Sequence, residues 1–183
     1  ARHAVETQGA AFADLQRRFA PQVRSKDLSL RFSIAPPVPR HLVGDPLRLG
    51  QVLGHLLDNA VRYTETGFVE VSCVFAEQDG PRVGLRFSIK DSGPGMEARQ
   101  VTALHRLFSG DSRPVPEEEP GKSSGLGLLL AHKLVMVMGG GVSVDSVPGQ
   151  GSVFSFQVTF GTRSASRVSK IRVLTGMRVL VVD

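Results

Sequence analysis

The sequence is poor in several residue types, and each shortage limits what the protein can be. Its 183 residues contain no tryptophan, one tyrosine and one cysteine, Cys73. A single cysteine excludes an internal disulfide, and nothing else in the sequence indicates an oxidising compartment. Cys73 stands among alternating apolar residues, so we expect it in the core. The N-terminus also lacks the charged and then apolar pattern of a signal peptide.

A hydrophobic run long enough to cross a membrane is missing as well. The longest apolar stretch, GLGLLLAHKLVMVMGGG, is interrupted by His132 and Lys133, and it is too short and too polar to span a bilayer. Hydrophobic residues nevertheless make up 41% of the chain, which is enough for a packed core. Much of the net charge of +5 lies after residue 162, where no aromatic residues are interleaved. This composition predicts a solvated linker, and we expect no nucleic-acid partner.

Apolar and polar residues recur with helical and strand periods along the chain. Asp45 followed by Pro46 is a helix start, with the aspartate as N-cap and the proline in the first turn. The predicted helices cover 5–24, 46–64, 97–108 and 125–138. The predicted strands cover 28–34, 68–75, 82–90, 142–147 and 152–160, and the last four form two hairpins.

The strands alternate apolar and polar residues, so one face of the sheet should be solvated or only partly covered. About three helices would cover the other face, which gives a two-layer α/β sandwich with a mixed, mostly antiparallel sheet. The helix at 5–24 carries an apolar stripe of Phe12, Leu15, Phe19 and Val23. Such a stripe needs a partner helix, and the sequence does not obviously supply one.

The helix at 46–64 carries polar groups on the side away from its leucines. At about 100° per residue, one arc holds Gln51, His55, Asn59, Arg62 and Tyr63. An asparagine oxygen can coordinate Mg²⁺, an arginine can bind phosphate through two nitrogens, and a tyrosine can pack against a base. An ordinary solvated helix face explains the same pattern equally well.

The stretch SIKDSGPGM places Asp91 directly after a predicted strand, followed by Gly93 and Gly95. Two glycines allow the backbone to approach a ligand closely or to adopt positive φ. A carboxylate at a strand end can accept a hydrogen bond from an amino group such as the exocyclic amine of adenine. A tight surface turn is the alternative, because Asp-Ser-Gly-Pro is also good turn chemistry. The loop that begins here runs to Ser124, and loops of this length are often lids.

The stretch GKSSGLGLLLAHKL opens a helix with Gly125 and Gly127 after a polar loop. Free amides at a helix N-terminus bind phosphate, and Lys122, Ser123 and Ser124 could add donors. A P-loop is not indicated, because the upstream glycine of that motif is replaced and no strand precedes it. A buried helix that simply begins with glycine is the alternative.

In this order, the stretches resemble the ATP-binding catalytic domain of bacterial sensor histidine kinases, in the larger ATPase superfamily that includes DNA gyrase. QVLGHLLDNAVRYT resembles the N box, DSGPG the first glycine box, LHRLFSGDSR a weak F box and GLGL the second glycine box. SVPGQGSVFSFQVTF is similar to the closing hairpin of the family. The resemblance covers about residues 28–161 and implies the Bergerat-type ATP-binding fold.

The resemblance implies a role for each matching residue, with ATP and Mg²⁺ as cofactors. Asn59 would hold Mg²⁺ between the phosphates of ATP, and Asp91 would bind the adenine amino group. Gln51 stands where many members have a glutamate that is a proposed catalytic base. The γ-phosphate would pass to a histidine on a dimerisation helix. The other implied nucleotide contacts are Arg62, Tyr63, Gly93, Gly95, Phe108, Lys122, Ser124, Gly125, Leu126, Gly127 and Leu128.

Three positions depart from the family pattern. Gln51 cannot accept a proton, although hybrid relatives often carry glutamine there. His55 stands where the family commonly has another asparagine, and an imidazole is a poor Mg²⁺ ligand. His105 replaces the first aromatic residue of the F box, whereas Phe108 keeps the second. None of the five histidines fits the phosphoacceptor pattern of the family, so the acceptor helix is expected upstream of this chain.

The resemblance also divides the chain and implies its partners. Residues 1–27 would be the end of a dimerisation helix and a connector, 28–161 the ATP-binding domain, and 162–177 a linker. Residues 178–183 would be the truncated first strand of a receiver domain. The whole protein would be a homodimer that uses its own dimerisation and receiver domains. This part would lie in the cytoplasm of a bacterium, in a protein anchored in the inner membrane.

Two other functions stay open. One is a degenerate kinase domain that binds little nucleotide and regulates another sensor kinase by protein contact, which His55 and His105 motivate. The other is an ATPase of the DNA-repair or topoisomerase type. Those ATPases activate water with a glutamate in the N-box helix, and Gln51 is not an acid.

Overall fold

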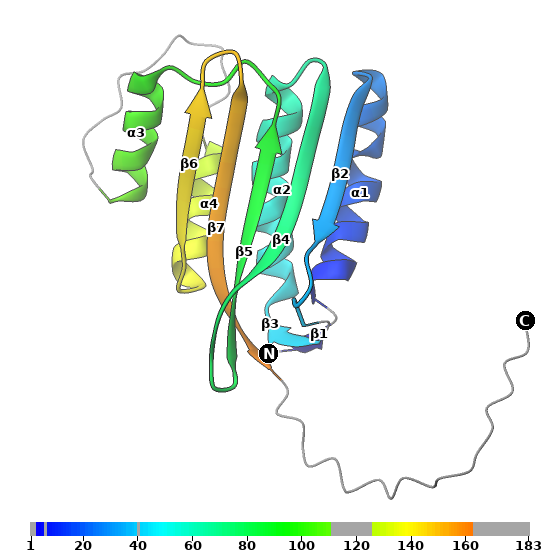
Figure 1. Ribbon diagram of the computed structural model, residues 1–183, viewed down its shortest axis with the longest axis vertical. Coiled ribbons are helices and arrows are strands. Elements are labelled where there is room, and N and C mark those ends of the chain that lie inside the picture. The colour runs from blue at the N-terminus through cyan, green and yellow to red at the C-terminus, as the bar shows by residue number, and fades with distance from the viewer. Residues whose placement is uncertain (1–2, 6, 40, 111–125, 163–183) are drawn as a thin grey trace, which may run out of the picture.

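A sheet with helices packed on one face makes up the described part of the protein (Figure 1). The computed structural model describes residues 3–5, 7–39, 41–110 and 126–162. Its helices are α1 (Thr7–Ser25), α2 (Pro46–Tyr63), α3 (Ala98–Phe108) and α4 (Leu126–Val137). Its strands are β1 (His3–Val5), β2 (Leu28–Ile34), β3 (Leu42–Gly44), β4 (Gly67–Asp79), β5 (Arg82–Asp91), β6 (Gly141–Val147) and β7 (Gly151–Thr162). Every predicted helix and strand is present, and the predicted two-layer α/β sandwich is confirmed.

The sheet is mixed and mostly antiparallel, as predicted. Its strand order is β1-β3-β7-β5-β4-β2. Strand β6 also pairs with β7, on the side of β7 opposite to β5. Strands β2 and β4 form the parallel pair of the described sheet. The short strands β1 and β3 are not predicted from the sequence, because three residues are too few to show an alternation.

The inner face of the sheet and the apolar sides of the helices form one hydrophobic core. Phe87 of β5 is fully buried there and stacks on Phe156 of β7, with ring centroids 5.1 Å apart. Cys73 of β4 is buried in the same core, as predicted, and burial raises the pKa of its thiol to about 12. The thiol therefore stays neutral at physiological pH and is not a reactive nucleophile.

The other face of the sheet carries short polar side chains. Serines stand opposite one another in register across neighbouring strands, and the Oγ atoms of Ser88 and Ser155 lie 3.0 Å apart. The complete row is Ser33, Ser72, Ser88, Ser155 and Ser143. Hydroxyl groups can pair with one another or with water on such a surface. The prediction that one face is solvated is confirmed.

Helix α1 packs on the domain itself. The stripe residues Phe12, Leu15 and Phe19 are at most 5% exposed, and the Phe12 ring lies 5.2 Å from that of Phe32 in β2. Gly54 of α2 faces this helix: a Cβ there would lie 3.2 Å from Arg18 Nη1 and, in ordinary van der Waals contact, 3.8 Å from Leu15 Cδ2. The expectation that the chain supplies no partner for this stripe is therefore wrong, because α2 and the sheet cover it.

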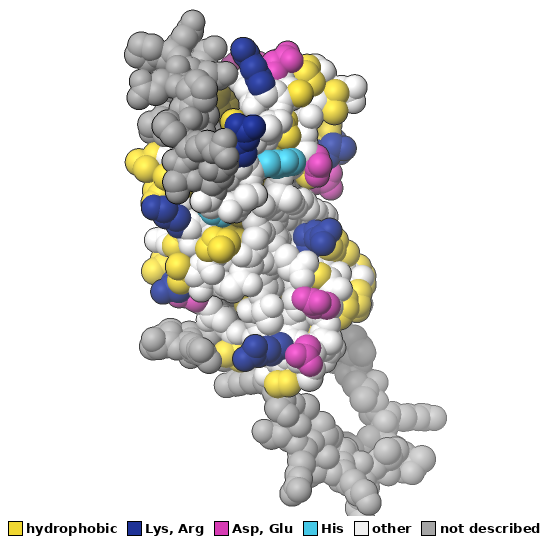
Figure 2. All heavy atoms as spheres, turned by 90° about the vertical axis from the view of Figure 1, so that its left-hand side faces the viewer, with side chains coloured by type: hydrophobic (Ala, Val, Ile, Leu, Met, Phe, Trp, Pro, Cys, Tyr) yellow, Lys and Arg dark blue, Asp and Glu magenta, His cyan; other side chains and the backbone are white. Residues whose placement is uncertain are grey.

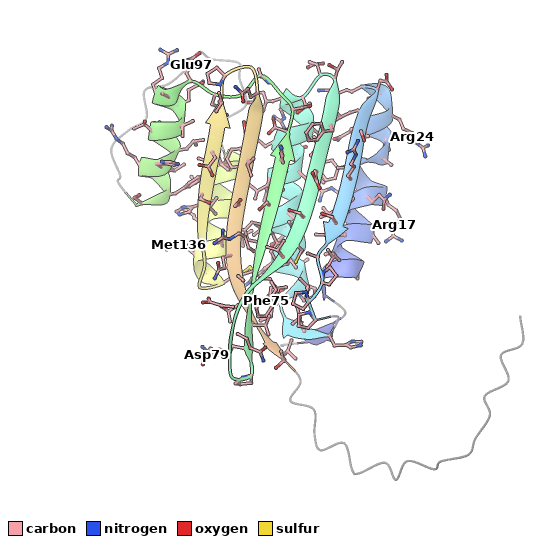
Figure 3. The ribbon with its side chains drawn as sticks, viewed as in Figure 1. Arg17, Arg24, Phe75, Asp79, Glu97 and Met136 are labelled. Carbon is pink, nitrogen blue, oxygen red and sulfur yellow. The ribbon has the colours of Figure 1, made fainter. Side chains whose placement is uncertain are left out.

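Charged side chains lie on the outside, with both signs interspersed. Figure 2 shows this mixture on the side of the molecule where α3 lies, and Arg17 and Arg24 project from α1 away from the sheet (Figure 3). The ion pair between Arg17 and Asp14 is mostly exposed, and such pairs contribute under about 1 kcal/mol. The fold therefore depends on its core rather than on surface charge. Among the described helices, none combines the length and the hydropathy that a membrane span requires.

Candidate functional site

Five of the predicted site residues that the structure describes lie at one end of the domain: Arg62, Tyr63, Asp91, Gly93 and Gly95. Helix α2 and strand β5 both end there, beside the turn between β6 and β7, at the top in Figure 1. The structure thus brings the N-box helix and the first glycine stretch together. Lys122, Ser124 and Gly125 lie outside the described residues, as does the part of the predicted lid from 111 onward.

Asp91 closes β5 with a buried carboxylate. The residue is 6% exposed, and its Oδ1 accepts hydrogen bonds from the backbone N–H groups of Gly93 and Ser152, at 2.9 and 3.3 Å. Burial raises the pKa of Asp91, and these two hydrogen bonds oppose part of that shift. Both amides bind Oδ1, so neither holds Oδ2. A ligand that donated a hydrogen bond to Oδ2 would offset part of the cost of burying the carboxylate.

Gly93 lies where the end of α2 meets the end of β5, and the space around its α-carbon is filled. A Cβ at this position would lie 2.9 Å from Asp91 Oδ1 and 3.2 Å from both Thr64 Oγ1 and Tyr63 O. Such contacts are too short, so a side chain here would displace the carboxylate of Asp91 or the last turn of α2. Gly93 is therefore required by the packing between the ends of α2 and β5.

Thr64 lies beside Gly93 and is not predicted from the sequence as a site residue. It is fully buried, and its hydroxyl donates to Ala60 O at 2.7 Å. Thr64 is also the C-cap residue of α2. A threonine at a helix end carries no functional signal in the sequence, because its contact with Gly93 depends on a distant segment.

The segment that follows Asp91 is attached to the turn between β6 and β7. Gly95 has a φ of +69°, and a Cβ on it would collide with the carbonyl oxygen of Val147. The N–H of Gly149 donates to Pro94 O at 2.7 Å. These backbone contacts explain why Gly95 must be glycine, independently of any ligand.

Ser146 connects the same turn to the start of α3. Its hydroxyl accepts from the N–H of Met96 at 2.9 Å and donates to Gly151 O at 2.9 Å. Ser152 follows Gly151 and donates its own N–H to Asp91. The turn therefore positions both the carboxylate and the segment that leads into α3. The sequence predicts this region only as a strand pair, because the bonds to Met96 and Asp91 join distant positions.

The polar side of α2 matches its predicted composition. The predicted apolar residues are all buried, whereas Gln51 is exposed and His55 and Asn59 are half-buried. Arg62 and Tyr63 are exposed at the end of the helix. A half-buried asparagine on this side can present its amide oxygen beyond the helix surface without leaving a buried group unpaired.

Arg62 forms an ion pair within α2 in addition to its predicted role. Its guanidinium donates to Asp58 Oδ2 at 2.7 Å, one turn earlier in α2. Both side chains are substantially exposed, so the pair contributes under about 1 kcal/mol. Arg62 can therefore leave Asp58 and bind a more highly charged anion with little loss of free energy.

The start of α4 lies against the polar side of α2. A Cβ at Gly127 would lie 3.6 Å from His55 Nδ1, in ordinary van der Waals contact. Leu126 is exposed and Leu128 is half-buried in the same turn. The structure therefore places His55, which differs from the family pattern, beside the second glycine stretch. The sequence does not reveal this proximity.

Two histidines attach α3 to the rest of the domain. His105 Nε2 lies 2.9 Å from Val144 O of β6 and is the donor, because a carbonyl only accepts. The ring of Phe108 packs on His132 of α4 with centroids 5.2 Å apart, and His132 Nε2 lies 3.2 Å from Phe108 O. An aromatic ring without an N–H could not make the bond of His105. This departure from the family pattern therefore has a structural explanation.

The buried carboxylate of Asp91, the end of α2 and the turn between β6 and β7 thus lie together at one end of the domain. Residues 44–162 match the family model described as histidine kinase-, DNA gyrase B-, and HSP90-like ATPase. The chain belongs to this family, and the predicted resemblance is confirmed.

Within this family, the chain is similar to curated sensor histidine kinases. The chain is 36% identical to sensor histidine kinase GacS of Pseudomonas protegens over 165 residues, which cover 90% of this chain and 18% of the relative. It is 35% identical to sensor histidine kinase RcsC of Escherichia coli K12 over 160 residues, which cover 87% of this chain and 16% of the relative. The chain therefore spans less than a fifth of the length of these relatives.

Solved structures agree with this assignment. Full-length ShkA in complex with AMPPNP is 29% identical, with a TM-score of 0.70, and the match covers 90% of this chain and 32% of that one. The catalytic domain of histidine kinase ThkA shares the fold at 18% identity, with a TM-score of 0.60 and coverages of 86% and 95%. The chain is an ATP-binding catalytic domain of the histidine-kinase type, as predicted.

Proposed function

We propose that this chain is the catalytic module of a hybrid sensor histidine kinase, which transfers the γ-phosphate of ATP to a histidine on a dimerisation helix outside the chain. The observation that carries the proposal is the carboxylate of Asp91, buried at the end of β5 with Oδ1 fixed by two amides. The names of the relatives GacS and RcsC support the reaction type.

The base end of the site is assigned to Asp91, Gly93, Gly95 and Tyr63. Oδ2 of Asp91 would accept a hydrogen bond from the exocyclic amine of adenine, and Gly93 keeps side-chain atoms away from that carboxylate. Gly95 holds the loop on the turn between β6 and β7, and the exposed ring of Tyr63 would pack beside the base. Guanine presents a carbonyl where adenine has its amine, so the pocket would place two acceptors together and reject GTP.

The phosphate end is assigned to α2 and the start of α4. Asn59 fits a Mg²⁺ ligand because its amide oxygen is hard and Mg²⁺ takes only one or two protein oxygens besides phosphate and water. Bound Mg²⁺ would neutralise phosphate charge, and the chain itself would contribute binding and orientation. Arg62 would exchange Asp58 for phosphate, and Gln51 would orient the reacting groups without accepting a proton. Further contacts are assigned to Phe108, Lys122, Ser124, Gly125, Leu126, Gly127 and Leu128.

The proposal extends to the parent protein. Residues 28–161 would form the ATP-binding domain and 162–177 a linker. Residues 1–27 would connect the domain to a dimerisation helix, and α1 within this segment packs on the domain core. Residues 178–183 would begin a receiver domain. The parent protein would be a homodimer with this part in the bacterial cytoplasm and an anchor in the inner membrane.

Replacing His55 with asparagine should tighten binding of a Mg²⁺–ATP analogue by about 3- to 10-fold, the equivalent of one added hydrogen bond. An imidazole is a poor ligand for Mg²⁺, whereas an amide oxygen is a good one. Titration calorimetry at several Mg²⁺ concentrations measures the effect. His41→Asn is the matched control, because His41 is exposed just before β3 at the other end of α2. Unchanged affinity in His55→Asn would count against a metal-side role for this position.

Phosphotransfer tests the proposed reaction. The parent protein, incubated with ATP labelled at the γ-phosphate, should acquire label that is stable in base and released by acid, as expected of phosphohistidine. Asn59→Ala should abolish the labelling, whereas His41→Asn should retain it. Acid-stable label, or labelling that survives Asn59→Ala, would contradict the proposed mechanism.

A further inference from the structure

We propose that Lys26 is a positioning residue for the base end of the nucleotide site, a role that rests on the proposed function of Asp91. Lys26 follows α1 and lies far in sequence from the site. Its ammonium donates to the carbonyl oxygens of Val61 at 3.0 Å, Arg62 at 2.9 Å and Thr64 at 3.4 Å. It also lies 3.5 Å from Glu65 Oε1. One cation thus binds three carbonyl oxygens at the C-terminal end of α2.

The end of α2 needs such a partner. The last carbonyls of a helix have no N–H donor within the helix. The negative end of the helix dipole also attracts a cation. Many helices end with a glycine in the left-handed conformation, but Thr64 is extended, with φ of −97°. The ammonium of Lys26 caps these carbonyls instead of a glycine turn, and the Lys26 side chain is only 27% exposed. An ammonium offers three donors, which matches three carbonyls.

The turn that Lys26 caps lies beside the residues assigned to the base end of the site. A Cβ on Gly93 would lie 3.2 Å from both Thr64 Oγ1 and the carbonyl oxygen of Tyr63, and the N–H of Gly93 fixes Asp91 Oδ1. The last turn of α2 is therefore held by Lys26 through some of its carbonyls and contacts Gly93 through others. If this turn frays, Tyr63 and Thr64 move, and the contact that sets the Gly93–Asp91 hydrogen bond is lost.

The position of the ammonium depends in turn on α1. The N–H of Lys26 donates to Val23 O at 3.3 Å in the last turn of that helix. Asp27, with φ of +51°, then reverses the chain into β2. Lys26 therefore connects the end of α1 to the end of α2, and through it to Asp91. A displacement of α1 relative to α2 would change the base site by withdrawing this ammonium.

Nucleotide titration of Lys26→Met, compared with a control that weakens the same helix elsewhere, tests the inference. Lys26→Met keeps the aliphatic chain and removes the charge, and we expect binding of a non-hydrolysable ATP analogue to weaken at least fivefold. Lys26→Arg should restore most of the affinity, because it returns a cation. The control is Asp45→Ala, which removes the N-cap bond to Arg48 N at the opposite end of α2. It should lower the melting temperature but keep the affinity within twofold.

Amide hydrogen exchange in the nucleotide-free protein gives a second, independent readout. The N–H of Gly93 should exchange faster in Lys26→Met than in wild type and should be unchanged in Asp45→Ala. Wild-type affinity together with unchanged exchange at Gly93 in Lys26→Met would overturn the inference and leave the proposed function intact. If the wild-type chain bound no nucleotide, the proposed function would fail, and exchange at Gly93 would still decide whether Lys26 positions this loop.

Discussion

Replacing Asp91 with asparagine should weaken nucleotide binding by about 100-fold or more, which corresponds to about 2.8 kcal/mol, while the domain stays folded. The asparagine oxygen can still accept the N–H groups of Gly93 and Ser152. Its NH₂ group then faces the position assigned to the exocyclic amine of adenine. Two donors in a buried site leave each other unsatisfied, which explains the size of the loss. Calorimetric titration with a non-hydrolysable ATP analogue and Mg²⁺ measures it.

The same substitution should leave the domain at least as stable as wild type at neutral pH. Burial raises the pKa of Asp91 in the folded protein above its ordinary value of 3.8. Between these two pKa values the native state holds a proton that the unfolded chain has released, so the free energy of unfolding falls as the pH rises through this window. Above the window the native protein carries the full cost of a buried carboxylate, and Asp91→Asn removes that cost.

Chemical unfolding followed from just below the ordinary pKa of 3.8 up to neutral pH checks the sign. Wild type should lose stability relative to Asp91→Asn as the pH rises. A constant difference between the two proteins across this range would contradict the raised pKa. Unfolding of Asp91→Asn at neutral pH would show that the carboxylate itself, rather than its accepting oxygen, holds the loop.

Replacing Gly151 with alanine should destabilise the domain by about 3–5 kcal/mol and remove nucleotide binding. Gly151 has a φ of +94°, and a Cβ on it would collide with the carbonyl oxygen of Asp91 and lie 3.1 Å from Ser92 Cα. The backbone of β7 would have to move away from β5. The N–H of Ser152, which fixes Asp91, would move with it. Denaturant unfolding and nucleotide titration measure the two effects.

Gly149 supplies a matched control in the same turn. Its φ is +76°, but no atom lies within 4 Å of a Cβ built there. Gly149→Ala should therefore cost only the conformational penalty of a left-handed alanine, about 1–2 kcal/mol. The additional loss in Gly151→Ala measures the collision with β5. Equal losses in the two variants would show that this close approach does not position Asp91.

The helices and hairpins are predictable because their periodicity extends over many residues. Helix α2 is the clearest example, since Asp45 caps it with a bond to Arg48 N at 3.1 Å and Pro46 occupies its first turn, as predicted. Its predicted apolar side is entirely buried, and comprises Leu49, Leu53, Leu56, Leu57, Ala60 and Val61.

Strand ends are less predictable, because pairing extends strands through residues without alternation. The sequence predicts an end at Phe75, whereas β4 continues to Asp79 through a register shift between Phe75 and Glu77. The polar residues beyond the shift are held by backbone bonds to β5. A β-bulge of this kind depends on the partner strand and leaves no local pattern.

Some residues of the candidate site are predictable from the sequence and others are not. Asp91, Gly93 and the end of α2 follow from motifs in the sequence, and the structure places them side by side. Their roles toward the nucleotide stay predictions. Thr64, Ser152 and Lys26 are not predictable from local patterns, because each acts on a segment far away in the sequence. Lys26, for example, bonds carbonyls 35 to 38 residues later.

Calorimetric titration of this chain with a non-hydrolysable ATP analogue, with and without Mg²⁺, tests the central claim most directly. We predict binding that is strengthened by Mg²⁺ and lost in Asp91→Asn, which would establish the region where the ends of α2 and β5 meet as the nucleotide site. Absence of binding up to millimolar nucleotide would contradict the account. It would favour the degenerate kinase domain, which acts on another kinase through protein contact.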